Sequence, residues 1–335
     1  MKANLTDKFF SIPYRSKSLK TLLQQTPKDK LELVYLLTNH ERWINTKIEL
    51  INYILTHYQD ILHIFFSYFT TDIWKFIELL LKKNGELTVK DSGNVEYIVL
   101  LNMYLIAFPV IKNGERTLIV PHETLDFLKK LDKTDYITNV KLNDTITTYT
   151  RALLEYYGYY EIDVLEKYLK KYEDIEFAFD KYFPILSNDS LIYGYYVEEN
   201  CVYLPTIEEN PTFFMTRKQI NNIDYYPLTK KDIYSYTHIS KEEVDLANFF
   251  IDHFEIDEDD LASTILAIKL CIQMDFSIKD ILEDLDYLEL SPYEMKQLEK
   301  CLVNLQNNTR LWSLKGYTKN ELKVPKLIRF PKSLN

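Results

Sequence analysis

Apolar residues recur every three or four positions through most of this 335-residue chain, and this spacing predicts amphipathic helices. Two places break the helical pattern with short runs rich in β-branched and aromatic residues, which are typical of strands. We expect a β-hairpin at each place: residues 107–111 with 116–120, and 191–197 with 201–204. The predicted fold class is therefore mainly α with small β-hairpins (α+β).

The first hairpin carries clear local signals. Asn113 and Gly114 lie between its strands and supply the positive φ angles that a tight turn needs. Pro109 has no N–H to donate to a neighbouring strand, so its strand should lie at the edge of a sheet. Pro121 follows the second strand and should open the next helix at its first position.

This hairpin lies between two helices, which gives it the order of the second half of a winged helix. An apolar helix at 94–105 precedes the hairpin, and we expect the complete winged helix at 61–135. A similar order recurs at 140–207, which predicts a second winged-helix-like module. Its helices are expected at 145–157, 161–171 and 175–183, with the last one ended by Pro184.

Residues 1–60 are expected to form a small helical module. Thr46 and Glu49 can form a capping box that begins a helix ending near His57, with a separate apolar helix at 60–69. The motif Lys47-Ile48-Glu49-Leu50 follows a helix and an extended loop. It resembles the SAP-like module at the amino end of the transcription terminator Rho, and this resemblance implies nucleic-acid binding.

Residues 225–308 predict an all-helical domain whose helices have recognisable starts. Capping boxes are expected at Thr229–Asp232, Ser240–Glu243 and Ser291–Glu294. The helices themselves are expected at about 229–236, 241–254, 259–273, 278–286 and 292–307.

Charge is distributed unevenly along the chain. The net charge is −10, yet residues 1–33 carry +4 and residues 309–335 carry +6. Because an acidic body repels phosphate, nucleic-acid contacts should lie near the basic ends and the first hairpin. The candidates are Arg15, Lys17, Lys20, Lys28, Lys30, Lys47, Lys112, Arg116, Lys323, Lys326, Arg329 and Lys332.

A protein partner is the alternative, because the helix at 94–105 contains no Lys or Arg, whereas groove reading relies on Arg, Lys, Asn and Gln. The winged helices would then serve as scaffolds of an interaction adaptor or inhibitor. Tyrosines, which anchor many protein interfaces, gather in the second module at positions 156, 157, 159, 160, 193, 195, 196 and 203. The candidate partner contacts are Tyr193, Tyr195, Tyr196, Leu327 and Phe330.

The basic segment 309–335 alternates apolar and cationic residues. We expect residues 309–322 to dock on the helical domain. Pro325 and Pro331 forbid a long helix beyond them. Residues 323–335 should therefore run extended over the acidic surface of that domain or over a partner.

No motif in the chain indicates catalysis, a metal or another cofactor, so we expect a protein that is not an enzyme. The three cysteines lie far apart and the six histidines lack metal-binding spacing. The amino terminus lacks the apolar stretch of a signal peptide. The most apolar run, 61–69, is far shorter than the ~20 residues needed to span a bilayer. A cytoplasmic location without membrane insertion is the expectation.

The whole order of modules can be compared with a family. The SAP-like start, the winged helix and the helical domain occur here with the phrases YYPLTKKDIYSYT (225–237) and LWSLKGYTKNEL (311–322). The chain thereby resembles a group of poorly characterised bacterial proteins, which implies a nucleic-acid-associated role in transcription. Some members end in a small zinc module of the SecA carboxy-terminal type. Residues 309–335 contain no cysteine, so no metal is inferred.

Overall fold

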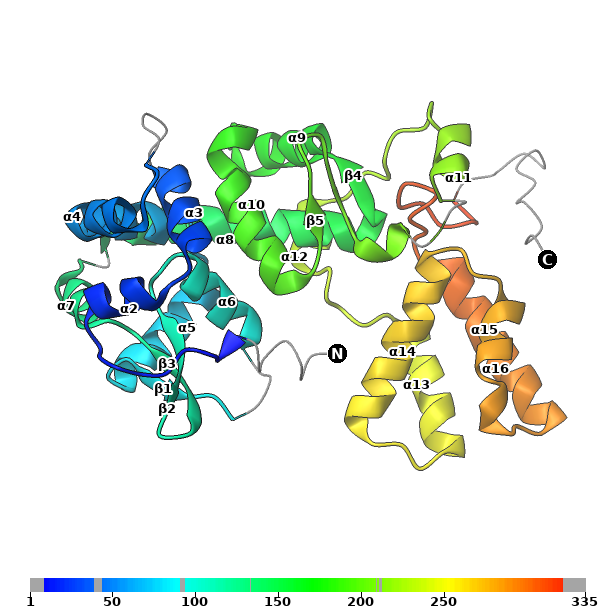
Figure 1. Ribbon diagram of the computed structural model, residues 1–335. Coiled ribbons are helices and arrows are strands. Elements are labelled where there is room, and N and C mark those ends of the chain that lie inside the picture. The colour runs from blue at the N-terminus through cyan, green and yellow to red at the C-terminus, as the bar shows by residue number, and fades with distance from the viewer. Residues whose placement is uncertain are drawn as a thin grey trace. The chain divides into compact units, whose positions relative to one another are not determined.

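The computed structural model describes residues 9–38, 44–90, 94–132, 134–208, 210 and 213–321 (Figure 1). It is mainly helical with two small three-stranded antiparallel sheets, which confirms the predicted α+β class. The chain divides into two compact units. The first unit comprises residues 1–147 and 180–193, and the second comprises 148–179 and 194–335.

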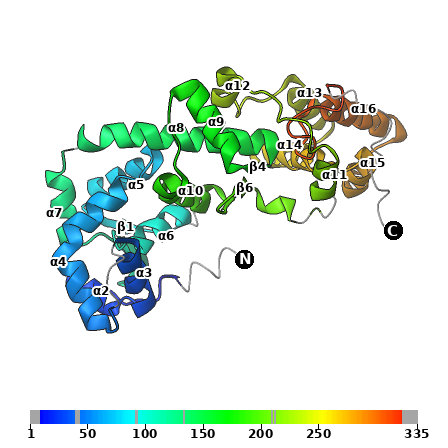
Figure 2. The ribbon, with the colours of Figure 1, turned by 90° about the horizontal axis from the view of Figure 1, so that it is seen from above.

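The first unit contains an amino-terminal group of helices and one sheet. Its helices are α2 (Leu19–Gln25), α3 (Lys28–Thr38), α4 (Lys47–Phe66), α5 (Thr71–Lys82), α6 (Val95–Met103) and α7 (His122–Lys130), with nearly all of α10 (Phe179–Tyr193). Its strands are β1 (Glu86–Thr88), β2 (Phe108–Lys112) and β3 (Glu115–Ile119). Helices α2 and α3 both pack on α4, as Figure 2 shows from above.

The sheet of the first unit has the order β1-β3-β2. The predicted hairpin is confirmed within one residue at each boundary, and Pro109 lies on the edge strand β2 as expected. Strand β1, which pairs with β3 on the other side, was not predicted. Pro121 is the N-cap of α7 and not its first residue, so that detail of the prediction is wrong by one position.

One long helix, α4, replaces the two helices expected at 46–57 and 60–69. The capping box of Thr46 and Glu49 is confirmed at its start. No glycine or proline interrupts the following twenty residues. Tyr58 and Ile61 continue the buried face of the helix across the expected break. The polar pair Gln59-Asp60 therefore lies on the exposed side of a continuous helix and does not start a new one.

The long helix α8 (Thr134–Tyr157) begins in the first unit and ends in the second. The second unit then contains β4 (Tyr159–Glu161), α9 (Ile162–Glu173), β5 (Tyr196–Val197), β6 (Cys201–Tyr203), the 3₁₀ turn η1 (Pro205–Ile207), α11 (Phe213–Gln219) and α12 (Lys230–Tyr234). Its sheet has the order β4-β6-β5. Neither β4 nor α11 was predicted.

Helix α10 corrects two predictions at once. Pro184 lies inside it and does not end it. A proline removes one intrahelical bond, and the helix continues past it because the following turns bury Ile185 and Leu186. The helix reaches Tyr193, so the strand expected at 191–197 is reduced to the two residues of β5.

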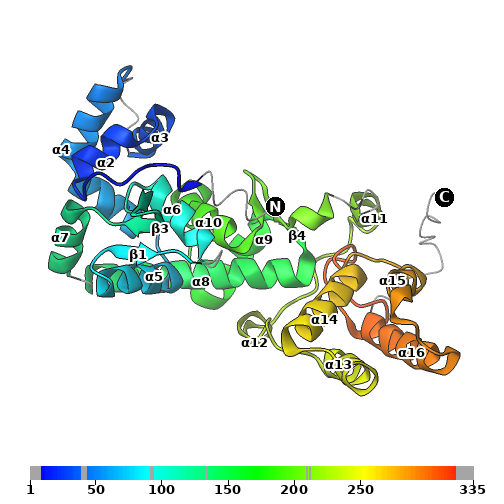
Figure 3. The same cartoon turned by 60° about the horizontal axis from the view of Figure 1, so that its bottom comes forward.

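The helices predicted between residues 241 and 308 are present. This part of the chain contains α13 (Lys241–His253), α14 (Glu258–Gln273), α15 (Ile278–Asp284), the 3₁₀ turn η2 (Asp286–Leu288) and α16 (Pro292–Asn308). All three predicted capping boxes are present. Figure 3 shows α13 packed between α14 and α16, with α15 against α16. Leu246, Ile272 and Leu302 are fully buried in the core of these helices.

Lys269 of α14 is held between two carboxylates. Its ammonium lies 2.9 Å from Glu155 and 3.2 Å from Glu243. Burial by itself would lower the pKa of Lys269, but the two carboxylates raise it overall. Burial by itself would raise the pKa of Glu243, but hydrogen bonds from Ser240 and the nearby Lys269 lower it overall.

The free energy of unfolding should therefore depend on the ionisation of Glu243. A carboxyl whose pKa is lowered on folding stabilises the fold above its unfolded pKa of about 4.3, and this contribution is lost as the pH falls through the folded value. We expect Glu243→Gln to flatten the acid limb of stability below about pH 4.3, measured by urea unfolding at several pH values. Glu294→Gln, in the equivalent but exposed capping box of α16, is the control and should flatten it less. Equal slopes for wild type and Glu243→Gln would contradict this account.

Residues 309–321 pack on the helices of residues 241–308, as predicted for this part of the chain. Leu311 and Leu314 enter the helical core. The indole of Trp312 donates to the carbonyl of Glu155 at 3.0 Å. Leu322 and the following residues lie outside the described part of the chain.

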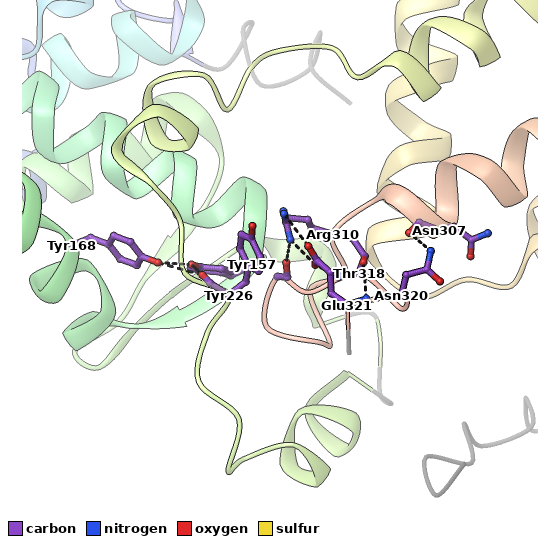
Figure 4. A network of polar contacts seen from close by, with 9 residues as sticks. Tyr157, Tyr168, Tyr226, Asn307, Arg310, Thr318, Asn320 and Glu321 are labelled. Carbon is purple, nitrogen blue, oxygen red and sulfur yellow. Dashed lines mark hydrogen bonds and ion pairs between the residues drawn. The ribbon is translucent and has the colours of Figure 1, made fainter. Parts of the chain in front are cut away.

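A polar network ties this segment to the end of α8 (Figure 4). Arg310 lies 3.4 Å from the centre of the Tyr226 ring and pairs with Glu321 at 2.9 Å. The hydroxyl of Tyr157 donates to the carbonyl of Tyr226 at 2.6 Å. The two phrases that carry the resemblance meet at Tyr226, whose backbone N–H donates to the carbonyl of Lys315 at 2.9 Å.

Candidate partner-binding surface

Several basic residues predicted to contact nucleic acid make contacts within the first unit. Lys17 is buried, donates to the carbonyl of Asn84 at 2.5 Å and lies 3.5 Å from Glu86. Lys112 pairs with the same Glu86. These two lysines flank Glu86, the first residue of β1. Burial alone would raise the pKa of Glu86, but the hydrogen bond from Lys112 lowers it overall.

Other candidates are engaged in a similar way. Lys30 donates to the side chain of Asn102 at 2.6 Å, and burial lowers its pKa despite the nearby Asp29. Lys28 pairs with Glu32 at 2.8 Å and Lys47 donates to the carbonyl of Gln24 at 2.8 Å. Arg116 is half-buried on β3, whereas Arg15 and Lys20 are exposed. Lys323, Lys326, Arg329 and Lys332 lie outside the described residues, and the assignment of all twelve to nucleic acid stays a prediction.

Helix α6, which would be the recognition helix of the first winged helix, is packed into the protein. Helix α6 buries Ile98, Leu100, Leu101 and Asn102. The side-chain amide of Asn102 donates to the carbonyl of Ala107 at 3.2 Å. The side chain of Asn102 in α6, the helix before the first hairpin, is therefore engaged in a hydrogen bond within the protein.

A row of tyrosines crosses the sheet of the second unit. Tyr159 of β4, Tyr203 of β6 and Tyr196 of β5 are direct cross-strand partners. Successive side chains of a strand point to opposite faces of a sheet, so residues in register share one face. The ring centres of Tyr159 and Tyr203 are 6.4 Å apart, and those of Tyr203 and Tyr196 are 5.4 Å apart. We call these three residues the tyrosine row.

The opposite face of this sheet is fully buried, whereas the rings of the row range from half-buried to exposed. Tyr159 and Tyr203 are half-buried and pack against a small cluster that includes Phe213 and Trp312. Tyr160 and Val202, the next pair in the register, are fully buried. Tyr196 is 48% exposed, and Phe214 of α11 is 51% exposed. The ring of Phe214 lies 5.5 Å from that of Tyr159, edge-on, and extends the aromatic surface beyond the sheet.

Carboxylates surround the tyrosine row. The hydroxyl of Tyr203 donates to Glu198 at 2.9 Å and to Glu208 at 3.0 Å. Burial, together with these two carboxylates, raises the pKa of Tyr203 well above its usual range. Burial and the nearby Glu161 raise the pKa of Tyr159 to about 12. Both phenols are therefore neutral at physiological pH, beside negative charge.

Arg217 shows how a cation interacts with these rings. Its guanidinium is buried and lies 5.1 Å from the centre of the Tyr159 ring and 5.3 Å from that of Phe213. It also donates to the carbonyls of Tyr157 at 3.1 Å and Trp312 at 2.8 Å. One end of the tyrosine row thus holds an internal cation, whereas Tyr196 at the other end is exposed.

The predicted partner contacts are distributed over different environments. Tyr196 belongs to the tyrosine row, whereas Tyr195 is buried and Tyr193 donates to Asp72 at 3.3 Å in the first unit. Leu327 and Phe330 lie outside the described residues. Phe214 was not among the predicted contacts, although Phe213-Phe214-Met215 is a short apolar run in the sequence.

Comparison with protein families, with characterised proteins and with solved structures found no match. Among the described residues, no helix combines the length and hydrophobicity needed to cross a bilayer. In the same part of the chain, no three His, Cys, Asp or Glu side chains gather in a way that would hold a metal ion.

Proposed function

We propose that this protein is a non-enzymatic, cytoplasmic protein-interaction adaptor that binds a basic segment of a partner on the tyrosine row. The observation that carries this proposal is the aromatic row of the half-buried Tyr159 and Tyr203 and the exposed Tyr196, with its rim of carboxylates. Tyrosine is enriched among the residues that dominate binding energy at interfaces.

The chemistry of the surface favours a cationic partner over phosphate. A Lys or Arg side chain over a tyrosine ring contributes about 0.5–1 kcal/mol at exposed sites, and Glu198 and Glu208 add attraction for the same charge. The same carboxylates repel a nucleic-acid backbone. Arg217 over Tyr159 is an internal example of the proposed contact.

A nucleic-acid-associated role in transcription is the second candidate. In the first unit, the order α5, β1, α6, β2, β3 with the sheet order β1-β3-β2 supports a winged-helix interpretation. Helices α2 to α4 support the SAP-like interpretation in the same way. Aromatic rows can also stack bases. Against this role, α6, the helix that would enter a groove, contains no Lys or Arg.

Fluorescence anisotropy can separate the two candidates. The probes are a labelled twelve-residue peptide of alternating arginine and glycine, a 30-base-pair DNA duplex and a 20-nucleotide RNA. We expect the full chain to prefer the peptide at 150 mM salt. Tyr196→Ser should weaken peptide binding about fivefold, equivalent to about 1 kcal/mol, while Tyr196→Phe keeps the ring and the affinity. Tighter binding of DNA or RNA, lost in Tyr196→Ser, would replace the adaptor by the second candidate.

A further inference from the structure

A second surface of the second unit, the α13–α14 groove, is apolar and open. It lies between α13, α14 and residues 236–239, and has a volume of about 470 Å³. Ile239 is 73% exposed, Leu266 is 65% exposed and Val244 is also exposed. Contiguous exposed apolar side chains mark interaction surfaces, whereas singly exposed ones are normal, and these three line one groove.

The groove lies on a strongly acidic part of the chain. Residues 240–308 contain 17 Asp and Glu against 5 Lys and Arg, a net charge of −12. Glu155, Glu243 and Glu258 line the groove itself. Lys269, the lysine that lines the groove, is already paired with Glu155 and Glu243. A segment that suits this surface is therefore both apolar and basic.

Residues 322–335 of the same chain have that chemistry. They contain four Lys or Arg and no Asp or Glu, a charge of +4. Their large apolar residues are Leu322, Val324, Leu327, Ile328, Phe330 and Leu334. Pro325 and Pro331 favour an extended chain, which can place alternate side chains into a groove and leave the cations at its acidic rim.

The covalent connection is short enough for this docking. The described chain ends at Glu321, which pairs with Arg310. Two residues from Arg310, Trp312 donates to the carbonyl of Glu155, a residue that lines the groove. Fourteen residues span up to roughly 45 Å when extended, and the attachment raises the effective concentration of the segment.

We propose that the α13–α14 groove is an intramolecular docking site for residues 322–335. Charge complementarity, the exposed aliphatic side chains and the short connection carry this assignment. It does not depend on the tyrosine row or on the proposed function.

Hydrogen exchange of the full chain tests the proposal. We compare wild type with the variant Leu327→Ser/Ile328→Ser/Phe330→Ser at low micromolar concentration. Exchange within 237–247 and 258–269 should be at least tenfold faster in the variant, while 292–305 of α16 should exchange equally in both. The groove variant Leu266→Asp should in turn speed exchange of 324–331. Tyr287→Asp, at an exposed residue of η2 outside the groove residues, should not.

Three results would overturn the assignment. Equal exchange of 237–269 in wild type and in the triple variant means that the segment does not dock there. Altered exchange at 196–208 instead places the segment on the tyrosine row. Protection that appears only as concentration rises shows docking between two copies. No partner is present in this experiment, so its result does not depend on whether the adaptor proposal is correct.

Discussion

Replacing Trp312 with alanine should lower the free energy of unfolding of the second unit by about 3–5 kcal/mol, the usual cost of removing a buried tryptophan. Trp312 is 1% exposed and packs with Ile207, Phe213 and Met274. Its indole N–H also satisfies the carbonyl of Glu155. The substitution therefore creates a cavity and removes one of two side-chain hydrogen bonds to this carbonyl, the other coming from Gln273 at 3.0 Å.

Urea unfolding followed by circular dichroism measures this effect. Tyr287→Ala is the control, because its side chain is exposed and surface substitutions change stability by about 0.5 kcal/mol or less. A loss below about 1 kcal/mol for Trp312→Ala would show that residues 309–321 do not contribute to the core of the second unit.

Gly158→Ala should lower the free energy of unfolding by about 3 kcal/mol. Gly158 has φ +65°, and a Cβ there would lie 2.4 Å from Cδ2 of Trp312. The left-handed backbone costs about 1–2 kcal/mol for a non-glycine residue, and overpacking adds about 1–3 kcal/mol. The same unfolding experiment measures the total.

Gly194→Ala is the matched control for this prediction. Gly194 has φ +71°, but a Cβ there would meet nothing within 4 Å. It should therefore show the backbone cost alone. In the double variant Gly158→Ala/Trp312→Ala the clash is absent. Its loss of unfolding free energy should therefore be smaller than the sum of the losses in the two single variants. Equal losses for Gly158→Ala and Gly194→Ala would contradict the close packing of Trp312 on Gly158.

A second glycine makes this packing reciprocal. A Cβ at Gly316 would lie 2.6 Å from the ring of Tyr157. Gly158 therefore lies against the ring of Trp312, and Gly316 lies against the ring of Tyr157. These two glycines explain why the segment around Trp312 and the end of α8 approach so closely.

Local signals of the chain predicted its local structure well. A capping box needs only four consecutive residues, so the starts of α4, α12, α13 and α16 could be located from the sequence. The turn at Asn113-Gly114 and the edge position of Pro109 depend equally on local backbone geometry. The break expected near Asp60 failed because it rested on polarity alone, without a glycine or proline.

The tyrosine row could not be located in this way. It depends on the pairing of Tyr159 with Tyr203, which are 44 positions apart, and β4 is too short to show a strand period. The tyrosine-rich composition indicated the region, but not which rings share a face. The tyrosines of this region differ in burial: Tyr157, Tyr160 and Tyr195 lie in the core, whereas Tyr196 is exposed.

Capture of partners from a nuclease-treated native lysate tests the adaptor proposal most directly. The baits are the immobilised full chain and its variants Tyr196→Phe, Tyr196→Ser and Tyr287→Ser, with bound proteins quantified by mass spectrometry. We expect at least one protein to be enriched equally by wild type, Tyr196→Phe and Tyr287→Ser, and lost from Tyr196→Ser. Enrichment that survives in Tyr196→Ser, or a lysate that yields nucleic acid alone when nuclease is omitted, would contradict the proposal.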